Sequence, residues 1–233
     1  MTRISFYAIV NIQCVCKRGE DMPRNKYPEE TVEKILDVSL KLFLEKGYEN
    51  TTVLDIVDHL GGLTRGAFYH HFKSKEEVMS VLSERLFYEN NPFEKVKRNQ
   101  DLNGLQKLKK IIEDSMEDTA YRKISIESIP LLDNPKFLAE QIESNRDIVM
   151  PAFQELIEEG IQDGSIHTDY PKQTAEILTF LVNFWMIPSV FPYEEEEGIL
   201  RIKLLRQVTD SMGIPIIDDE LMEQMEKVLS DSK

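Results

Sequence analysis

Apolar residues recur at three- and four-residue steps along most of the chain, which is the spacing of helices that bury one face. The first such segment follows Pro28 and carries five residues at this spacing: Val32, Ile35, Leu36, Leu40 and Phe43. Acidic residues stand near its beginning, where the helix dipole is positive, and Gly47 follows its last turn as a carboxyl-terminal cap. The pattern therefore predicts a helix that ends at Lys46.

Three further helices are predicted directly after it, each begun by a capping side chain. Thr52 is followed three residues later by Asp55, and Ser74 is followed three residues later by Glu77, so both pairs fit a capping box. Thr64 caps the helix between them, after a pair of glycines. The second and third helices span only about two turns, and helices this short are stable only when packed against neighbours. The four helices therefore predict one packed unit.

Beyond a break at residues 90–92 the pattern stays helical, with no alternation typical of strands. It predicts six helices, with a kink or break near 130–135: 102–122, 124–142, 145–163, 171–188, 198–212 and 218–230. The acidic run at 194–197 is interpreted as a solvated loop. The fold class predicted is all-α.

Composition changes at Met22, and the chain is divided there and after the fourth helix. Residues 1–21 are interpreted as an extension, either disordered or the product of a mis-assigned start. Residues 22–82 are predicted to form an amino-terminal domain that contains the four capped helices. Residues 83–233 are predicted to form a second, helical domain of the size needed for a core of its own.

The net charge of the 233-residue chain is −14, and most of the acidic excess lies beyond residue 90. This charge argues against non-specific coating of nucleic acid, but it leaves room for a local basic edge on the amino-terminal part. Cys14 and Cys16 have the spacing of neither a zinc site nor a disulfide scaffold. This use of cysteine favours a reducing cytoplasm, and the apolar runs are too short to span a membrane.

Motifs of catalysis are absent from the sequence. It contains no glycine-rich phosphate loop followed by Lys-Ser or Lys-Thr, no His-Glu-x-x-His and no cysteine or histidine cluster. We therefore expect neither an enzyme nor a bound cofactor or metal.

Two short helices joined by a glycine turn, with the first helix packed across them, are typical of a helix-turn-helix DNA-binding domain. Its recognition helix is expected at about 64–71. Because Ala67, Phe68 and Phe72 form the apolar side of that helix, Arg65, Tyr69 and His70 are expected to point outward. Arginine suits two-pronged pairing with guanine, and hydroxyls suit phosphates or base edges.

Residues 29–82 resemble the DNA-binding domain of the TetR-type (tetracycline-repressor-like) transcriptional regulators. The residues that carry the resemblance are LFLEKGYENTT at 42–52, the pair Asp55-Ile56, and TRGAFYHHFKSKEEV at 64–78. The stretch LGGLT makes the turn one residue longer than the family pattern. We therefore expect the recognition helix to form, while its tilt, and hence which side chain meets which base, is left open by the sequence.

The resemblance implies roles for individual residues. Thr52, Thr64, Tyr69 and Lys75 would hold phosphates; Arg65, Ala67 and His70 would face bases; His71 would do either. Lys73 flanks the fourth helix beside Lys75 and is a further phosphate candidate. The residues themselves leave simpler roles open: the threonines are also caps, Tyr69 and His71 also suit packing, and the lysines also suit a solvated surface.

The resemblance also implies a homodimeric repressor that binds an inverted repeat and is released by a small hydrophobic inducer. Helices 171–188 and 198–212 are the candidate dimer surface, with these apolar residues: Ile177, Leu178, Leu181, Leu200, Leu204, Leu205 and Val208. The candidate pocket residues are Met116, Tyr121, Met150, Phe153, Phe180, Phe184 and Trp185. Intramolecular core is the alternative for both sets. An alternative function is a helical interaction module whose helix-turn-helix binds a partner protein rather than DNA.

Overall fold

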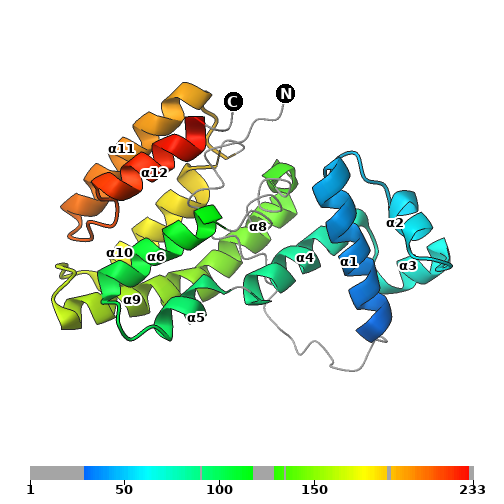
Figure 1. Ribbon diagram of the computed structural model, residues 1–233, viewed down its shortest axis with the longest axis horizontal. Helices are drawn as coiled ribbons and strands as arrows, with labels where there is room; N and C mark the ends of the chain where they lie inside the picture. The colour runs from blue at the N-terminus through cyan, green and yellow to red at the C-terminus, as the bar shows by residue number, and fades with distance from the viewer. Residues whose placement is uncertain (1–28, 90, 118–128, 134, 188–189, 231–233) are drawn as a thin grey trace.

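The structure is a computed structural model that describes residues 29–89, 91–117, 129–133, 135–187 and 190–230. The regular elements of these residues are all helical, as the sequence predicts. Residues 1–21 and Tyr121 lie outside the described residues. In Figure 1 the helices α1 to α4 form one end of the molecule, and α10, α11 and α12 lie toward the other end.

The first four helices have the predicted boundaries. They are α1 (Glu29–Lys46), α2 (Val53–His59), α3 (Arg65–His71) and α4 (Lys75–Glu89). Gly47 takes a positive φ of 83°, as a carboxyl-terminal cap requires. The three predicted caps are present, because Asp55 N, Ala67 N and Glu77 N donate to the hydroxyls of Thr52, Thr64 and Ser74.

The segment after the break differs from the prediction in one element. A short helix, α5 (Pro92–Lys97), begins at Asn91, whose side-chain oxygen accepts from Phe93 N and Glu94 N. Sequence periodicity missed α5 because six residues do not complete two turns of a repeating pattern. The next helix, α6 (Gly104–Glu117), begins two residues later than predicted.

Two breaks were predicted in the next part of the chain, and the structure treats them differently. The break near 130–135 is confirmed, because a 3-10 turn, η2 (Ile129–Asp133), precedes α8 (Pro135–Ser144). The predicted break between 142 and 145 is wrong. From α8 the chain then continues through a π-helical turn, η3 (Asn145–Val149), directly into α9 (Met150–Asp163). A π turn inserts an extra residue without ending the helix, and this shift of register resembles a break in a sequence pattern.

A second π turn occurs in the next helix. The helix α10 (Pro171–Phe180) runs into η4 (Leu181–Trp185), and α11 (Glu195–Ser211) and α12 (Asp219–Ser230) complete the chain. The prediction of a loop at 194–197 is wrong, because α11 begins at Glu195. Negative side chains are favourable at the positive end of a helix dipole, so this acidic run suits a first turn.

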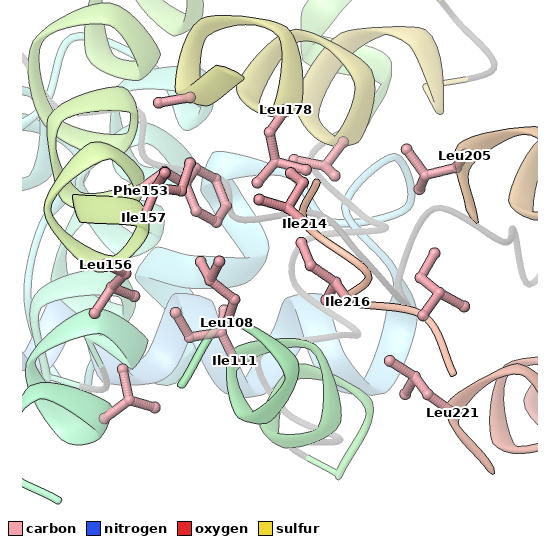
Figure 2. Packing of buried hydrophobic residues seen from close by; sticks show 14 of the residues in the cluster. Leu108, Ile111, Phe153, Leu156, Ile157, Leu178, Leu205, Ile214, Ile216 and Leu221 are labelled. Atoms are coloured by element: carbon pink, nitrogen blue, oxygen red, sulfur yellow. The ribbon is translucent and has the colours of Figure 1, made fainter. Parts of the chain in front are cut away.

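Two main apolar clusters form the core. One lies within α1 to α4 and includes Ile35, Phe43, Ile56, Phe68 and Leu82, each fully buried or nearly so. The other cluster is formed by residues of α5, α6, α9, α10, α11 and α12. Figure 2 shows Phe153, Leu178, Leu108, Ile111 and Ile216 of this cluster directed toward one another.

Phe137 on α8 packs against the first cluster, although α8 itself belongs to the later part of the chain. The helix α4 is fixed to α1 by Arg85, whose two terminal nitrogens lie 2.7 Å from Glu33 Oε2 and 2.9 Å from Asp37 Oδ1. The amino-terminal unit is thus held internally by ion pairs and contacted from outside by α8.

Candidate DNA-binding interface

The turn between α2 and α3 is built from two glycines with positive φ angles. Gly61 has φ of 61° and Gly62 has φ of 106°. Side chains strongly disfavour the second value, so the longer turn depends on glycine. It brings α3 against α2 while Phe68 is fully buried and Phe72 is nearly so.

The beginning of α2 is fixed by a network around Asp55. Thr52 N donates to Asp55 Oδ2 at 2.8 Å, and Lys46 Nζ lies 2.9 Å from Asp55 Oδ1. Hydrogen bonds from Thr52, then from Lys46, hold the pKa of Asp55 well below its ordinary value. Thr52 is exposed to solvent although its hydroxyl caps α2.

The outward side of α3 carries the predicted polar residues. Arg65, Tyr69 and His70 are exposed, and the exposed fraction of Tyr69 is 42%. The Arg65 guanidinium lies 5.5 Å from the centre of the Tyr69 ring, and that ring meets Phe68 edge-on. Tyr69 therefore packs on one side and supports an arginine on the other. Thr64 is exposed at the cap, and Ala67 is half-buried.

His71 lies at the boundary between this surface and the core. It is half-buried, and its ring is 5.2 Å from that of His70. Burial lowers the pKa of His71, and the neighbouring His70 lowers it further. A neutral His71 has no charge to offer a phosphate near pH 7.

The two candidate lysines have different surroundings. Lys73 is exposed, and its backbone N–H donates to Glu77 Oε2 at 2.6 Å. Lys75 is half-buried: its ammonium donates to Tyr48 O at 2.8 Å and lies 4.0 Å from the centre of the Tyr48 ring. Tyr48 in turn donates to Glu76 Oε1, and burial raises the pKa of its hydroxyl. Sequence reasoning missed Tyr48, because its contact with Lys75 spans 27 residues.

Five of the candidate residues are exposed on α3 or directly beside its ends, and we call them the α3 surface: Thr64, Arg65, Tyr69, His70 and Lys73. Thr52 is exposed at the start of α2. Ala67 and His71 are only partly accessible, and Lys75 is engaged by Tyr48.

One of the candidate pocket residues, Phe153, lines a described cavity. A small apolar cavity of about 20 Å³ is lined by Phe153 together with Leu108, Ile111, Ile112, Ser115, Leu178, Val182 and Ile216. Met116 is buried in the surrounding core, and Met150 packs against it. Phe184 is buried, whereas Phe180 is 48% exposed. Arg201 lies 4.9 Å from the centre of the Trp185 ring.

Among the described helices, none is both long and apolar enough to cross a membrane. Within the same residues, no three histidine, cysteine, aspartate or glutamate side chains gather in a way that could hold a metal ion.

The comparisons with known proteins agree with a helix-turn-helix regulator. The family described as bacterial regulatory proteins, tetR family, matches residues 35–82, which extend from α1 into α4. A transcriptional repressor, KstR2 of Mycolicibacterium smegmatis, is 28% identical over 148 residues, 61% of this chain and 70% of that protein. The regulator AcrR of Shigella flexneri is 43% identical over 56 residues, but these cover only 24% of this chain and 26% of that protein.

Solved structures extend the likeness of the fold beyond the helix-turn-helix. A TetR-family transcriptional regulator from Pectobacterium atrosepticum has a TM-score of 0.60 at 21% identity, covering 80% of this chain and 95% of that one. Reduced NemR from E. coli has a TM-score of 0.52 at 17% identity, covering 87% and 96%. Fold and helix-turn-helix together define a transcriptional regulator. Residues 35–82 match the tetR family of bacterial regulatory proteins, and the fold of the chain resembles that of a solved TetR-family regulator.

Proposed function

We propose that this regulator is a homodimeric repressor that binds an inverted-repeat operator and leaves it when a small hydrophobic ligand binds. The observation that carries the DNA-binding part is the α3 surface. On a helix of only seven residues, Phe68 is directed into the core while Arg65, Tyr69 and His70 are exposed. Such a division leaves a row of hydrogen-bonding side chains to meet a major groove.

Within this proposal Arg65 reads a base, because its guanidinium matches the two acceptors of guanine. Thr52, Thr64, Tyr69 and Lys73 hold phosphates. The contribution of Lys75 is indirect, through the position of α4, because Tyr48 already binds its ammonium. His70 and Ala67 face the bases beside Arg65.

The proposal of a homodimer rests on apolar residues left exposed on α10 and α11. Ile177 and Phe180 on α10 are 45% and 48% exposed, and Leu200 and Leu204 on α11 are 64% and 48% exposed. Neighbouring exposed apolar side chains of this size commonly mark an interaction surface. We infer that α10 and α11 pair with the same helices of a second copy in a four-helix bundle.

The two apolar clusters support a division of the chain into two domains with different functions. We infer that residues 22–82 form the DNA-binding domain and residues 83–233 the regulatory and dimerisation domain. Ligand release would then act through a displacement of α4 or α8 that changes the separation of the two recognition helices. Such coupling typically amounts to about 1–3 kcal/mol.

The DNA-binding proposal is tested by selecting operators from random duplex DNA with the full chain and measuring affinity by gel shift. We expect an inverted repeat whose half-sites are separated by about 34–36 Å, one turn of B-DNA. Binding without sequence preference, or no binding, would reject it. A reporter gene placed behind the selected operator should be transcribed less when the regulator is present; increased transcription would identify an activator.

The dimer is tested by light scattering of Leu204→Glu, which we expect to be monomeric and to bind the operator more weakly. Ile161→Glu is the control, because Ile161 is an exposed apolar residue on α9, outside the proposed surface. A Leu204→Glu protein that remains dimeric would place the interface elsewhere.

Ligand release is tested with the single tryptophan. A compound that releases operator DNA should change Trp185 emission over the same concentration range, and Trp185→Phe should remove that signal without preventing dimerisation. Compounds that release DNA and leave the emission unchanged would place the pocket away from Trp185.

A further inference from the structure

Uncharged polar side chains are buried where two helices of the regulatory part carry π turns. Gln141 and Ser144 on α8, Asn145 on η3, Thr179 on α10 and Asn183 on η4 are each at most 5% exposed. Five polar residues are an unusual content for two helices in an apolar core, because each buried polar group must find a partner.

Hydrogen bonds join the two π turns directly. Asn183 Nδ2 donates to Asn145 Oδ1, and Asn145 Nδ2 donates to the carbonyl of Gln141 at 2.9 Å. Thr179 is satisfied within its own helix, because its hydroxyl donates to Ala175 O at 2.8 Å. π turns occur often at functional sites, and here two of them are connected by side chains 38 residues apart.

Gln141 is the exception in this group. Its side chain is fully buried, and neither Oε1 nor Nε2 has a hydrogen-bond partner within the part of the chain that the structure describes. A carboxamide carries two donor hydrogens and an acceptor oxygen, and leaving them unpaired in the interior is unfavourable. The fold therefore presents a buried donor and acceptor that an outside group could satisfy.

The apolar cavity is lined in part by α10 and η4, which also carry Thr179 and Asn183. Leu178 and Val182 line the cavity, and each is followed directly along the helix by one of the buried polar residues, Thr179 and Asn183. A volume of about 20 Å³ is room for about one water molecule. A larger ligand would have to move the helices that close around it, and α10 is one of these helices.

The charge of such a ligand is limited by its surroundings. The five buried polar residues are uncharged. The next two residues after Asn145, Arg146 and Asp147, form an ion pair with each other, in which Arg146 Nε lies 3.0 Å from Asp147 Oδ1. An ionised group buried here would lack a counter-charge from these residues, which is strongly unfavourable. The site suits an apolar molecule with one uncharged hydrogen-bonding group.

Phe137 connects this site to the DNA-binding unit. It lies four residues before Gln141, so the two residues share one face of α8. Its side chain packs against the apolar cluster of α1 to α4. A shift of α8 at Gln141 would therefore move a side chain that touches the DNA-binding core.

We propose that Gln141, Asn145 and Asn183 bind the uncharged carboxamide-like group of an otherwise apolar effector. This inference rests on the proposed ligand release and names the chemistry of its ligand. Gln141 supplies both a donor and an acceptor, Asn145 and Asn183 exchange their mutual hydrogen bond for bonds to the ligand, and the apolar body occupies an enlarged cavity beside Val182.

The test uses three small probes of similar shape with the full-length protein: benzamide, benzoate and ethylbenzene. Saturation-transfer NMR should show benzamide bound at least tenfold more tightly than either of the others. Gln141→Met should remove this preference, because Met has a similar volume and no amide. Thr179→Val is the matched control and should keep it, because its hydroxyl is already satisfied within α10. Equal binding of benzamide and ethylbenzene, no binding of benzamide, or a preference that survives Gln141→Met would overturn the proposal.

A second measurement separates a ligand-binding role from a structural one. Without probe, Gln141→Met should raise the melting temperature by about 2–8 °C, because it removes an unsatisfied buried amide. A lowered melting temperature would indicate that Gln141 stabilises the fold, and would overturn the proposal. If Gln141→Met does not fold, Gln141→Leu provides the same comparison, because leucine also lacks the amide and leaves little space empty.

The outcome can be separated from that of the proposed function. Wild-type protein that binds its selected operator and is released by some compound, yet shows no preference for benzamide, overturns only the ligand chemistry. Wild-type protein that binds no operator overturns the proposed function, whatever benzamide does.

Discussion

The two parts of the chain are both helical, yet their helices are specified in different ways. In α1 to α4 each predicted boundary depends on residues within four positions of one another, such as the Thr52–Asp55 capping box. In the later part, the start of α6 combines a local cap, in which Gln106 N donates to Asn103 Oδ1, with bonds from far away: Gly104 N donates to Asp163 Oδ2, and Leu105 N donates to Ser165 Oγ. The DNA-binding unit is therefore readable from local sequence, whereas the regulatory part depends in addition on contacts between distant segments.

The largest effect is expected where two backbones of the regulatory part nearly touch. A Cβ added at Gly104 would lie 2.3 Å from Gly160 N, so Gly104→Ala must push α6 away from α9. We expect it to lower the free energy of unfolding by about 3 kcal/mol or more. Chemical denaturation followed by circular dichroism measures this.

Gly66→Ala in α3 is the matched substitution in the DNA-binding unit. A Cβ at Gly66 meets only Thr64 Oγ1, at an ordinary 3.8 Å. Because alanine favours helices, we expect stability unchanged or raised by up to about 1 kcal/mol. A Gly104→Ala protein as stable as Gly66→Ala would show that α6 and α9 can separate freely, against the contrast drawn between the two parts.

The next effect concerns DNA affinity and separates two residues of the α3 surface. Arg65→Ala should lower operator affinity by about 1–3 kcal/mol and relax the preference at one position of each half-site. Lys73→Ala should weaken binding to all sequences alike and reduce the salt dependence by about one phosphate contact per site. Gel shifts on the operator and on single-base variants, at several salt concentrations, distinguish these patterns. Identical, sequence-independent losses would reject base reading by Arg65.

Features set by neighbouring residues could be predicted from the sequence, and features set by distant contacts could not. The caps of α2, α3 and α4 and the outward direction of Arg65, Tyr69 and His70 are visible locally, because Phe68 and Phe72 define the inward side. The π turns η3 and η4 are invisible to a pattern with 3.6 residues per turn. The bond between Lys75 and Tyr48 is a tertiary contact, so sequence gave no sign that this lysine is engaged.

A smaller effect is expected from removing the cap of the recognition helix. Thr64→Ala leaves Ala67 N without the hydroxyl that it donates to at 3.2 Å, and should cost about 1 kcal/mol of stability. Thr64→Asp keeps a cap but adds negative charge beside the proposed phosphate. If Thr64 has both roles, denaturation should find Thr64→Asp close to wild type while gel shifts find it the weaker DNA binder of the two. Equal DNA affinity in the two variants would leave capping as its only role.

The smallest effect is a dependence of stability on pH that comes from His71 in the DNA-binding unit. Burial, and then the neighbouring His70, lower the pKa of His71 below the ordinary value of 6.5. As the pH falls below about 7, the unfolded chain therefore takes up a proton at this position before the folded one does. The free energy of unfolding should decrease as the pH falls through 6.5 toward the folded-state pKa, and should show no contribution from His71 at higher pH.

Denaturation of wild type and His71→Gln between pH 7.5 and 5.5 measures the difference, and NMR titration of the His71 ring gives the pKa directly. If His71→Gln has the wild-type slope and the ring titrates at or above its ordinary pKa, His71 is not held neutral by the fold and could carry charge to a phosphate.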